Sequence, residues 1–515
     1  MAYAFKTAIL VGKIMPESRE QAPTVNIVSF SESEYGHEED KIQDECGVFG
    51  VTGTKEGAVW MALDATITQG NRGEQATGIG VNVNGQLVSI ADKGNADVAF
   101  RGGRSLEGYS DAKSAVGHNL YTTQTKTELQ PVSLDGFLFT KNGNVTNADD
   151  LCERYEVETS DEMSDSGKLA RALSKQATEL GSIYDAIEEV IPKARGAFSI
   201  IILNEDGKLI LIRDRVGQRP LAKGKLADGS GWAAASETPV FDMIGAIDEG
   251  PAGDVKPGTY EVLGPEGVEK TYRWGRALHP QQKAIICGMG ATYFERTDGR
   301  VEDINIAEGR KKMGEFVAED NPVEADIAAP YPDSGRQMTT GMARVYKIPQ
   351  DDIFYKNHLK GKTYTQRVDL IKKAVRLKLN PIRSALEGKR VVAGDDSAVR
   401  GNTLGESVTD AKNAGAEEMH IRIAFPPIRN DCHYGMNMQK KDGFLATDRT
   451  VEEMAKVINA DSLAFNTPER LTQALGRDLG SVCMHCATGK TPEEMWPEQA
   501  KKIEEDITER ELVLA

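Results

Sequence analysis

The chain has 515 residues, of which 39% are hydrophobic and 27% are charged, and its formal net charge is −17. This length exceeds what one hydrophobic core organises, so the composition predicts a soluble globular protein of two or three domains. The acidic balance argues against broad binding to nucleic acid or to anionic membranes, and no run approaches the roughly 20 apolar residues of a membrane span. We therefore expect a cytoplasmic protein with no nucleic-acid and no membrane partner.

Residues 1–45 are interpreted as a leader. The last third, residues 31–45, is rich in Ser, Glu and Asp and poor in apolar side chains, which predicts a flexible segment. The apolar stretch at residues 8–12 is short and is flanked by Lys6 and Lys13. It therefore has the pattern of neither a signal peptide nor a transit peptide.

Cys46 follows the acidic pair Asp44-Glu45 and precedes a small, apolar run. Cleavage before Cys46 would give this residue a free α-amine beside its thiol. A thiolate is a good nucleophile, and a terminal amine that titrates near neutrality is a general base, so one residue would hold half of an active site. The local alternative is a buried cysteine with a structural role.

Strand patterns with intervening helices occupy residues 46–272. Residues 197–203 and 208–212 are rich in β-branched side chains, and the turn sequence Asn-Glu-Asp-Gly joins them, which predicts a β-hairpin. Residues 168–180 have helical spacing. A domain boundary is expected near residues 273–283, where Trp, Gly, Pro and Gln interrupt the pattern.

Beyond this boundary the pattern changes to a β-loop-α-β unit of a parallel sheet. Its predicted parts are a strand at 388–393, a loop at 395–402, a helix at 403–414 and a strand at 420–424. Ligands of such sheets bind beyond the carboxyl ends of the strands. One charged helix, residues 492–514, is expected to end the chain.

Asp395 and Asp396 lie in the loop of this unit. Two adjacent carboxylates can hold ribose hydroxyls and a magnesium ion, and the small and hydroxyl residues that follow expose N–H groups to a phosphate at a helix start. The spacing is not that of a Walker loop. The alternative is an ordinary acidic turn that caps a helix.

Six cysteines are present, and a disulfide framework is not expected in a large cytosolic chain. Cys483 and Cys486 form a CxxC pair, whose spacing alone leaves a zinc half-site or a redox pair open. Cys287 and Cys432 lie far away in the sequence. Cys152 is interpreted as a core thiol.

An ordered set of segments carries a resemblance to a known family: residues 70–75, 117–123, 141–144, 164–166, 213–221 and 235–238. In this order they resemble the glutaminase domain of the glutamine phosphoribosylpyrophosphate amidotransferases, and the resemblance spans residues 38–495. It implies an α+β then α/β fold, in which an N-terminal-nucleophile hydrolase antiparallel αββα sandwich precedes a type I phosphoribosyltransferase parallel-sheet domain. The implied parts are a propeptide (1–45), a glutamine amidotransferase domain (46–278), a phosphoribosyltransferase domain (279–496) and a C-terminal helix (497–515).

The resemblance also assigns roles in the glutaminase half. Cys46 would attack the side-chain amide of glutamine, and Asn142 with the N–H of Gly143 would form the oxyanion hole. Arg72 and Asp165 would hold the region of the substrate's α-carboxylate and its α-amine. Ammonia would then pass inside the protein to C1 of phosphoribosyl pyrophosphate (PRPP), giving 5-phosphoribosylamine in the first step of purine biosynthesis. A homotetramer is implied.

The second half would hold PRPP and two metal sites. The residues assigned to PRPP are Asp333, Ser334, Gly335, Lys356, Asp395, Asp396, Ser397, Arg400, Gly401, Asn402 and Thr403. Three of them, Ser334, Asp395 and Asp396, are expected to bind Mg²⁺. Residues 356–364 resemble a mobile lid, for which a solvated basic loop is the alternative. Cys287, Cys432, Cys483 and Cys486 match the ligands of a [4Fe–4S] cluster in one branch of the family, which we favour over structural zinc.

Several positions depart from the family pattern: Leu120 for an arginine, Lys141 for a histidine, Lys362 for an arginine, Asn402 for a threonine, and the small residues Gly167, Gly290, Ala291 and Gly394. Leu120 cannot donate a hydrogen bond to the glutamine carboxylate, and losing a charge-assisted bond costs roughly 1.5–3 kcal/mol. We therefore hypothesise that the phosphoribosyl half is better preserved, so that ammonia supports synthesis better than glutamine does.

Two other functions remain open. Asparagine- or glucosamine-forming amidotransferases with an N-terminal cysteine share the first half, but they lack the Asp395-Asp396 cradle. A non-enzymatic PRPP-binding sensor would share the second half, although it would have no use for Cys46 and Asn142.

Overall fold

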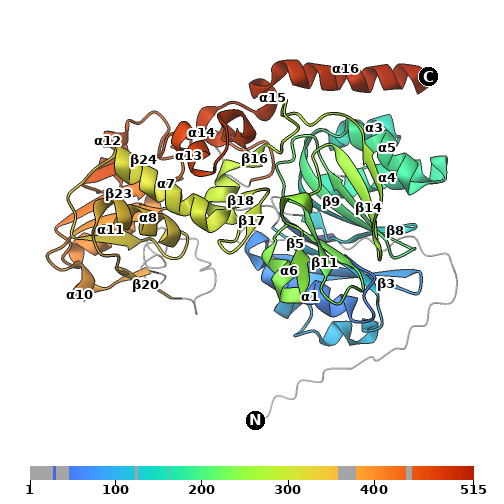
Figure 1. The fold of residues 1–515 in the computed structure, drawn as a ribbon, viewed down its shortest axis with the longest axis horizontal. Helices are drawn as coiled ribbons and strands as arrows, with labels where there is room; N and C mark the ends of the chain where they lie inside the picture. The colour runs from blue at the N-terminus through green and yellow to red at the C-terminus, as the bar shows by residue number, and fades with distance from the viewer. Residues whose placement is uncertain are drawn as a thin grey trace, which may run out of the picture.

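The computed structural model describes residues 27–29, 46–121, 126–160, 162–357, 379–436 and 443–514. Figure 1 shows two lobes, which correspond to the two halves expected from the sequence. Most of the predicted leader and residues 358–364 of the predicted lid lie outside the described residues, and so does Lys362.

Two antiparallel sheets form the centre of the first lobe. Within the described residues, one sheet has seven strands in the order β13 (Ala246–Asp248), β11 (Ala222–Leu226), β12 (Trp232–Ala235), β2 (Cys46–Thr52), β5 (Ser114–Leu120), β3 (Ala76–Val83) and β4 (Gln86–Lys93). The other has six described strands in the order β15 (Gly267–Arg273), β14 (Thr259–Gly264), β10 (Leu209–Arg213), β9 (Gly196–Asn204), β8 (Phe137–Val145) and β7 (Val132–Leu134).

Strand alternation explains why these sheets stack between helices. In β9, Ile201 packs between the sheets with Val48 and Val116, whereas Ile202 points to the helical side and packs with Leu169. Helices α3 (Ala148–Arg154), α4 (Asp165–Leu180) and α5 (Ile183–Val190) cover that side, and α1 (Ala58–Thr68), α2 (Ala96–Ala99) and α6 (Pro239–Ile244) cover the opposite sheet. This confirms the αββα sandwich and the predicted β9–β10 hairpin.

The second lobe is built on a parallel sheet. Its described strands are, in order, β19 (Ile327–Pro330), β22 (Arg390–Asp395), β23 (Glu418–Ile423) and β24 (Ser462–Phe465). Alternate residues again face opposite layers, because Val392 packs with Met313 and Val391 packs with Val408. The layers are α7 (Ile306–Asp320), α8 (Arg336–Tyr346) and α13 (Pro468–Ala474) on one side and α11 (Asn402–Asn413) with α12 (Val451–Val457) on the other. The predicted β-loop-α-β unit is therefore confirmed.

Short elements connect and edge the two lobes. The paired strands are β1 (Ile27–Ser29) with β6 (Lys126–Glu128), β16 (Ile286–Cys287) with β25 (Val482–Cys483), β17 (Arg300–Val301) with β18 (Ile304–Asn305), and β20 (Phe354–Lys356) with β21 (Leu379–Pro381). The short helices are Gly70–Arg72, Arg104–Tyr109, Ile191–Lys193, Gly250–Ala252, Gly290–Phe294, α10 (Arg383–Leu386), Leu479–Ser481 and α14 (His485–Thr488). No helix in the described part of the chain is both long and apolar enough to span a membrane.

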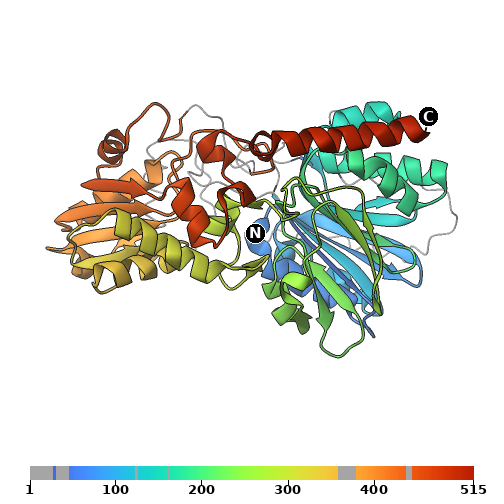
Figure 2. The same ribbon diagram turned by 45° about the horizontal axis from the view of Figure 1, so that its top comes forward.

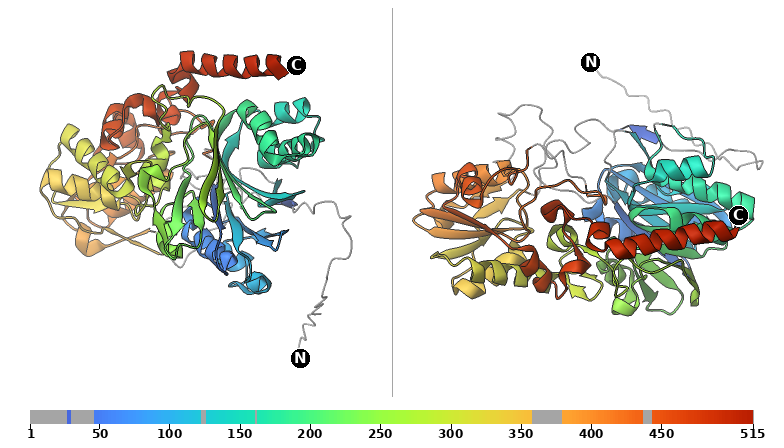
Figure 3. Two further views of the ribbon diagram at one scale, coloured as in Figure 1. Left: turned by 45° about the vertical axis from the view of Figure 1, so that its right-hand side comes forward. Right: turned by 90° about the horizontal axis from the view of Figure 1, so that it is seen from above.

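The C-terminal region differs from the single helix expected over residues 492–514. The structure has α15 (Pro492–Met495) and α16 (Pro497–Leu514), separated at Trp496. Pro497 has no N–H and restricts the backbone before it, while the Trp496 indole N–H donates to the Gly480 carbonyl at 3.0 Å. The break lets α16 run back along the first lobe, as Figures 1, 2 and 3 show.

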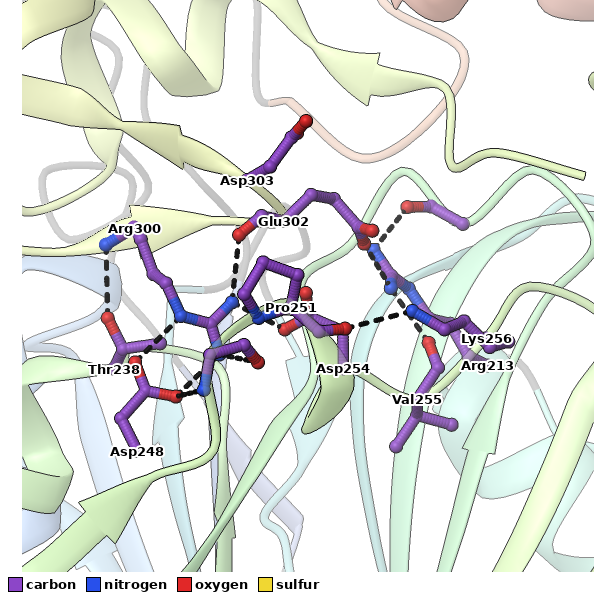
Figure 4. A network of polar contacts seen from close by, with 12 residues as sticks. Arg213, Thr238, Asp248, Pro251, Asp254, Val255, Lys256, Arg300, Glu302 and Asp303 are labelled. Atoms are coloured by element: carbon purple, nitrogen blue, oxygen red, sulfur yellow. Dashed lines mark hydrogen bonds and ion pairs between the residues drawn. The ribbon is translucent and has the colours of Figure 1, made fainter.

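A polar network holds the β17–β18 hairpin against the first lobe (Figure 4). Arg300 lies 2.5 Å from Asp248 and 2.8 Å from Asp254, and Arg213 lies 2.6 Å from Glu302. Burial and the Glu302 carboxylate raise the pKa of Asp254 to about 6, although Arg300 opposes this effect. Ionised Asp254 is therefore less stable here than in water.

This network predicts a pH-dependent stability. The folded state holds the Asp254 proton up to about pH 6, whereas an unfolded aspartate loses it near pH 4, so ionisation of Asp254 lowers stability as the pH rises between these values. We expect Asp254→Asn to remove the penalty, so that its Tm relative to wild type rises by a few degrees between about pH 4 and about pH 7. Thermal unfolding of both proteins across this range measures the effect.

Asp228→Asn is the control, because Asp228 is exposed and hydrogen bonds from Ser230 lower its pKa to about 2. Its Tm difference should stay flat over the same range. A flat difference for Asp254→Asn would contradict the prediction.

Candidate functional site

Cys46 is the first residue of β2, in the middle of the seven-stranded sheet. It pairs in register with Leu120 of β5, and its side chain packs in a small apolar cluster with Leu120, Ala76 and Leu129. The thiol is therefore buried, and the residue opposite it carries no charge. Cys46, the residue that the sequence predicts to be the nucleophile, thus lies at the buried start of β2.

The predicted oxyanion-hole residues lie on β8, whose sheet faces β2. The Asn142 side chain is fully buried, and neither of its polar atoms has a hydrogen-bond partner among the described residues. Such a group is costly to bury unless a ligand completes it. Gly143 has φ +102°, and a Cβ there would lie 2.1 Å from the Ala197 carbonyl oxygen, so only glycine fits.

Asp165 and Lys141 form an ion pair beside this strand. The Lys141 ammonium lies 2.9 Å from Asp165 Oδ2 and also donates to the Gly143 carbonyl. Asp165 begins α4, where it also accepts from the backbone N–H groups of Val145 and Ser166, both at 2.8 Å. Sequence reasoning named Asp165 and noted Lys141 as a departure, but it missed their pairing, which depends on how α4 meets β8.

The departure at Gly167 has a local explanation. A Cβ at this position would lie 2.1 Å from Glu128 Oε2. Arg171 holds that carboxylate with contacts of 2.7 and 2.9 Å. Glycine therefore leaves room for a Glu128–Arg171 pair beside the N-terminus of α4.

Arg72 is buried between two carboxylates. Its Nε donates to Glu237 at 2.9 Å, and its Nη2 contacts Glu295. The side chain also lies against the start of strand β2, because a Cβ at Gly47 would be 3.3 Å from Arg72 Cδ. The assignment of Arg72 to the glutamine carboxylate stays a prediction, and in this structure its guanidinium joins the two lobes.

Arg310 of α7 extends this junction to the second lobe. It donates to the Glu295 carbonyl at 2.7 Å and to the Ala291 carbonyl at 3.0 Å. Burial lowers the pKa of Arg310, whereas Asp396, Glu295 and Glu237 raise it, so their charges are near. A Cβ at Gly290 would lie 3.2 Å from Glu295 Oε1, which fits the small residue found there.

The acidic pair Asp395-Asp396 lies at the carboxyl end of β22 in the parallel sheet. Asp395 ends β22, and Asp396 is buried with Oδ1 accepting from Ser397 Oγ at 2.6 Å. Asp396 Oδ2, Ser334 Oγ and the Tyr331 hydroxyl are buried and have no hydrogen-bond partner among the described residues. These oxygens follow the carboxyl ends of two neighbouring parallel strands, β19 and β22, and buried oxygens without partners there predict a ligand or a cation.

Backbone geometry brings the surrounding loops close to this pair. A Cβ at Gly335 would lie 2.3 Å from the Gly394 carbonyl oxygen, and one at Gly394 would lie 2.6 Å from Thr339 Oγ1. Thr339 thus occupies the space that a side chain at position 394 would need, which explains why this departure from the family pattern is a glycine. Gly401 has φ +81° and caps α11, which starts at Asn402.

The remaining predicted phosphate ligands lie in two groups, one at Asp333 and Lys356 and the other at the start of α11. Lys356 Nζ lies 2.5 Å from Asp333 Oδ2, so these two residues form a pair. The Pro332–Asp333 peptide bond is cis. Thr403 follows Asn402 in the first turn of α11, and Arg400 precedes Gly401 at intermediate exposure.

Four of the cysteines lie on or near β16, β25 and α14, between the two lobes. Cys287 and Cys483 are partners in the β16–β25 pair. Burial raises the pKa of the Cys483 and Cys486 thiols well above its usual value, and the charges of Cys287 and Cys432 add to this. Among the described residues, no group of three or more His, Cys, Asp or Glu side chains has the arrangement of a formed metal site. Cys152 is buried in α3, apart from this group.

Known proteins share this combination over most of the chain. A glutamine amidotransferase domain family matches residues 118–243. The amidophosphoribosyltransferase of Bacillus subtilis is 32% identical over 470 residues, which cover 88% of this chain and 95% of that protein. The chain belongs to the amidophosphoribosyltransferase family.

Two further similarities agree with this family. The chloroplastic amidophosphoribosyltransferase of Glycine max is 33% identical over 482 residues, covering 91% of this chain and 82% of that protein. The solved glutamine PRPP amidotransferase of B. subtilis, in complex with ADP and GMP, is 31% identical with a TM-score of 0.78, covering 87% of this chain and 97% of that one. Membership of this family explains why an αββα sandwich and a phosphoribosyltransferase-type parallel sheet occur together in one chain.

The close approach at Gly335 predicts a sensitive position. Gly335→Ala would place a methyl group 2.3 Å from the Gly394 carbonyl oxygen. We expect the first turn of α8 to move away from β22. This should lower the free energy of unfolding by about 1–3 kcal/mol and the Tm by several degrees. Gly108→Ala is the control, since a Cβ there meets no atom within 4 Å. Equal Tm values for the two variants would contradict the prediction.

Proposed function

We propose that this chain catalyses the glutamine-dependent conversion of PRPP to 5-phosphoribosylamine, with release of pyrophosphate and glutamate. This is the amidophosphoribosyltransferase reaction, which opens purine biosynthesis. The observation that carries the proposal is the presence in one chain of a sandwich with Cys46 at the start of β2 and of a parallel sheet whose strand ends carry Asp395, Asp396 and buried oxygens that have no hydrogen-bond partner among the described residues. The relatives that match nearly the whole chain support it.

In the first half, the Cys46 thiolate would attack the side-chain carbonyl carbon of glutamine. The oxygen that becomes negative would accept from the Asn142 amide and the Gly143 N–H. The buried amide of Asn142, which has no partner in the part of the chain that the structure describes, supports this role. The α-amine of a new N-terminus at Cys46 would take the thiol proton and give it to the leaving ammonia. Water would then hydrolyse the thioester to glutamate.

In the second half, ammonia would attack C1 of PRPP as pyrophosphate leaves. Asp395 and Asp396 would hold the ribose hydroxyls, and Ser397, Arg400, Gly401, Asn402 and Thr403 would hold the 5-phosphate at the start of α11. Asp333, Gly335 and Lys356 would face the pyrophosphate. The developing charge at C1 makes placement of ammonia the main task of the protein.

A magnesium ion fits the same residues. Asp396 Oδ2 and Ser334 Oγ are buried oxygen atoms that have no partner in the described part of the chain, and Asp395 lies beside them. Mg²⁺ prefers such oxygen ligands together with substrate phosphates. Bound there, the ion would neutralise charge on the diphosphate.

We also propose that Cys287, Cys432, Cys483 and Cys486 hold a [4Fe–4S] cluster. The count of thiolates is the one such clusters need, and the mutual effects on the thiol pKa values support their proximity. The cluster would pin the segment before α15 to the junction between the lobes. Structural zinc is the alternative, because four thiolates also suit it.

The cluster proposal predicts a defined metal content. Protein purified without oxygen should contain about four iron and about four sulfide per chain and should lose its visible absorbance in air. Cys486→Ser should lower the iron content, whereas Cys152→Ser, at a cysteine in α3, should keep it. About one zinc per chain and no iron would contradict the cluster.

The leader, the assembly and the compartment remain predictions. Removal of residues 1–45 would expose the α-amine of Cys46, and the intact mass of purified protein measures it. A homotetramer is expected from the family resemblance, and a cytoplasmic location is expected from the composition.

Weaker use of glutamine than of ammonia is the second possibility, and Leu120 favours it. This buried apolar side chain stands directly opposite Cys46, where an arginine would otherwise meet a carboxylate. Ammonia as nitrogen donor would bypass this part of the site. Equal rates with glutamine and with ammonia would contradict this possibility.

Replacing Cys46 separates the two half-reactions. We expect Cys46→Ala to reduce glutamine-dependent pyrophosphate release to background, because the nucleophile is gone, and to leave ammonia-dependent release within about two-fold of wild type. Cys152→Ala should keep both rates. Retained glutamine-dependent synthesis in Cys46→Ala would overturn the assignment.

A further inference from the structure

The Lys141 ammonium group, on the residue before Asn142, lies in a cation site that the protein itself fills. Asp165 Oδ2 and the Gly143 carbonyl oxygen both contact one ammonium group, that of Lys141. The Lys141 side chain is 2% exposed, so its charge is withdrawn from water and depends on these two acceptors. A carboxylate and a carbonyl that converge in this way form a binding site for an ammonium group.

The position of this site relates it to the substrate. Gly143 and Asn142 are the residues proposed to meet the amide oxygen of glutamine, so the cation site adjoins the point of attack. Glutamine carries one cation, its α-ammonium group. The Asp165 carboxylate is also fixed, because it accepts backbone N–H groups at the start of α4.

We propose that Lys141 is a specificity-determining residue that occupies the α-ammonium subsite of the glutamine pocket in competition with the substrate. This inference rests on the proposed function. Glutamine binds fully only when Lys141 leaves Asp165, and the flexible four-carbon stem of lysine permits that movement. The apparent affinity is then reduced by the fraction of molecules in which the subsite is vacant.

Leu120 increases the effect of this competition. Its buried side chain offers no charge to the α-carboxylate of the substrate. Glutamine thus has to displace Lys141 without gaining an ion pair at Leu120. An amide that has no α-ammonium group makes no demand on Asp165 and does not compete with Lys141.

The test compares two amides in the full-length protein with PRPP and Mg²⁺ present. The first is glutamine, and the second is 4-carbamoylbutanoate, which is glutamine without its α-amine. Lys141→Met keeps the length and the apolar stem of the side chain but removes its charge. We expect it to lower the KM for glutamine at least ten-fold with little change in kcat, and to change kcat/KM for 4-carbamoylbutanoate less than two-fold.

Two controls accompany this variant. Lys141→Arg keeps a cation next to Asp165 and should keep the high KM for glutamine. Lys168→Met removes another lysine–aspartate pair. Lys168 lies in α4, the helix that begins with Asp165, and pairs with Asp149 at 2.6 Å. This variant should leave kcat and KM for both amides unchanged. If Lys141→Met does not fold, Lys141→Gln serves as the second neutral variant.

An unchanged or higher KM for glutamine in the neutral variants would overturn the proposal, and so would equal effects on the two amides. Failure of the proposed function has a different signature. Wild-type protein would then release no pyrophosphate with ammonia and PRPP, while glutamate release would still report on the Lys141 pocket.

Discussion

The buried pairing of Arg72 with Glu237 and Glu295 is the contact on which the rest of the structure depends. Arg72 and Glu237 belong to the first lobe, whereas Glu295 begins the segment that leads into the second. Charges withdrawn from water are stable only while all partners stay in place, so loss of one would leave an unpaired buried charge. These contacts therefore fix the junction at the point where the chain passes from the first lobe to the second.

The same junction brings the two candidate sites into one connected body. Arg72 packs against Gly47, the residue after Cys46, and Arg310 reaches from the Glu295 carbonyl toward the charge of Asp396. The cysteines of β16 and β25 and the returning helix α16 lie on the same side of the contact between the lobes. An enzyme that passes ammonia from one half to the other needs such a fixed relation, because misplaced halves would release the intermediate to water.

The departures from the family pattern fall into two kinds. Gly394, Gly167 and Gly290 are each matched by a neighbour that fills the space: Thr339, Glu128 and Glu295. These exchanges preserve packing. Leu120 and Lys141 instead change the charges around the proposed glutamine pocket, because one removes a cation and the other adds a cation that pairs with Asp165. The phosphoribosyl half contains no comparable exchange among its described acidic residues, which agrees with the hypothesis that it is the better preserved half.

The sequence by itself predicted the elements of the two folds, because hairpins and β-loop-α-β units depend on local patterns, whereas the roles of the site residues came from the family resemblance and stay predictions. The hairpin of β9 and β10 and the unit that presents Asp395 follow from side-chain periodicity and turn residues. Only the tertiary structure decided that Arg72 meets carboxylates 165 and 223 residues away, that Lys141 occupies Asp165, and that Trp496 divides the last helix. The physical reason is that an ion pair between distant residues depends on how sheets and helices stack, and short-range periodicity holds no information about that stacking.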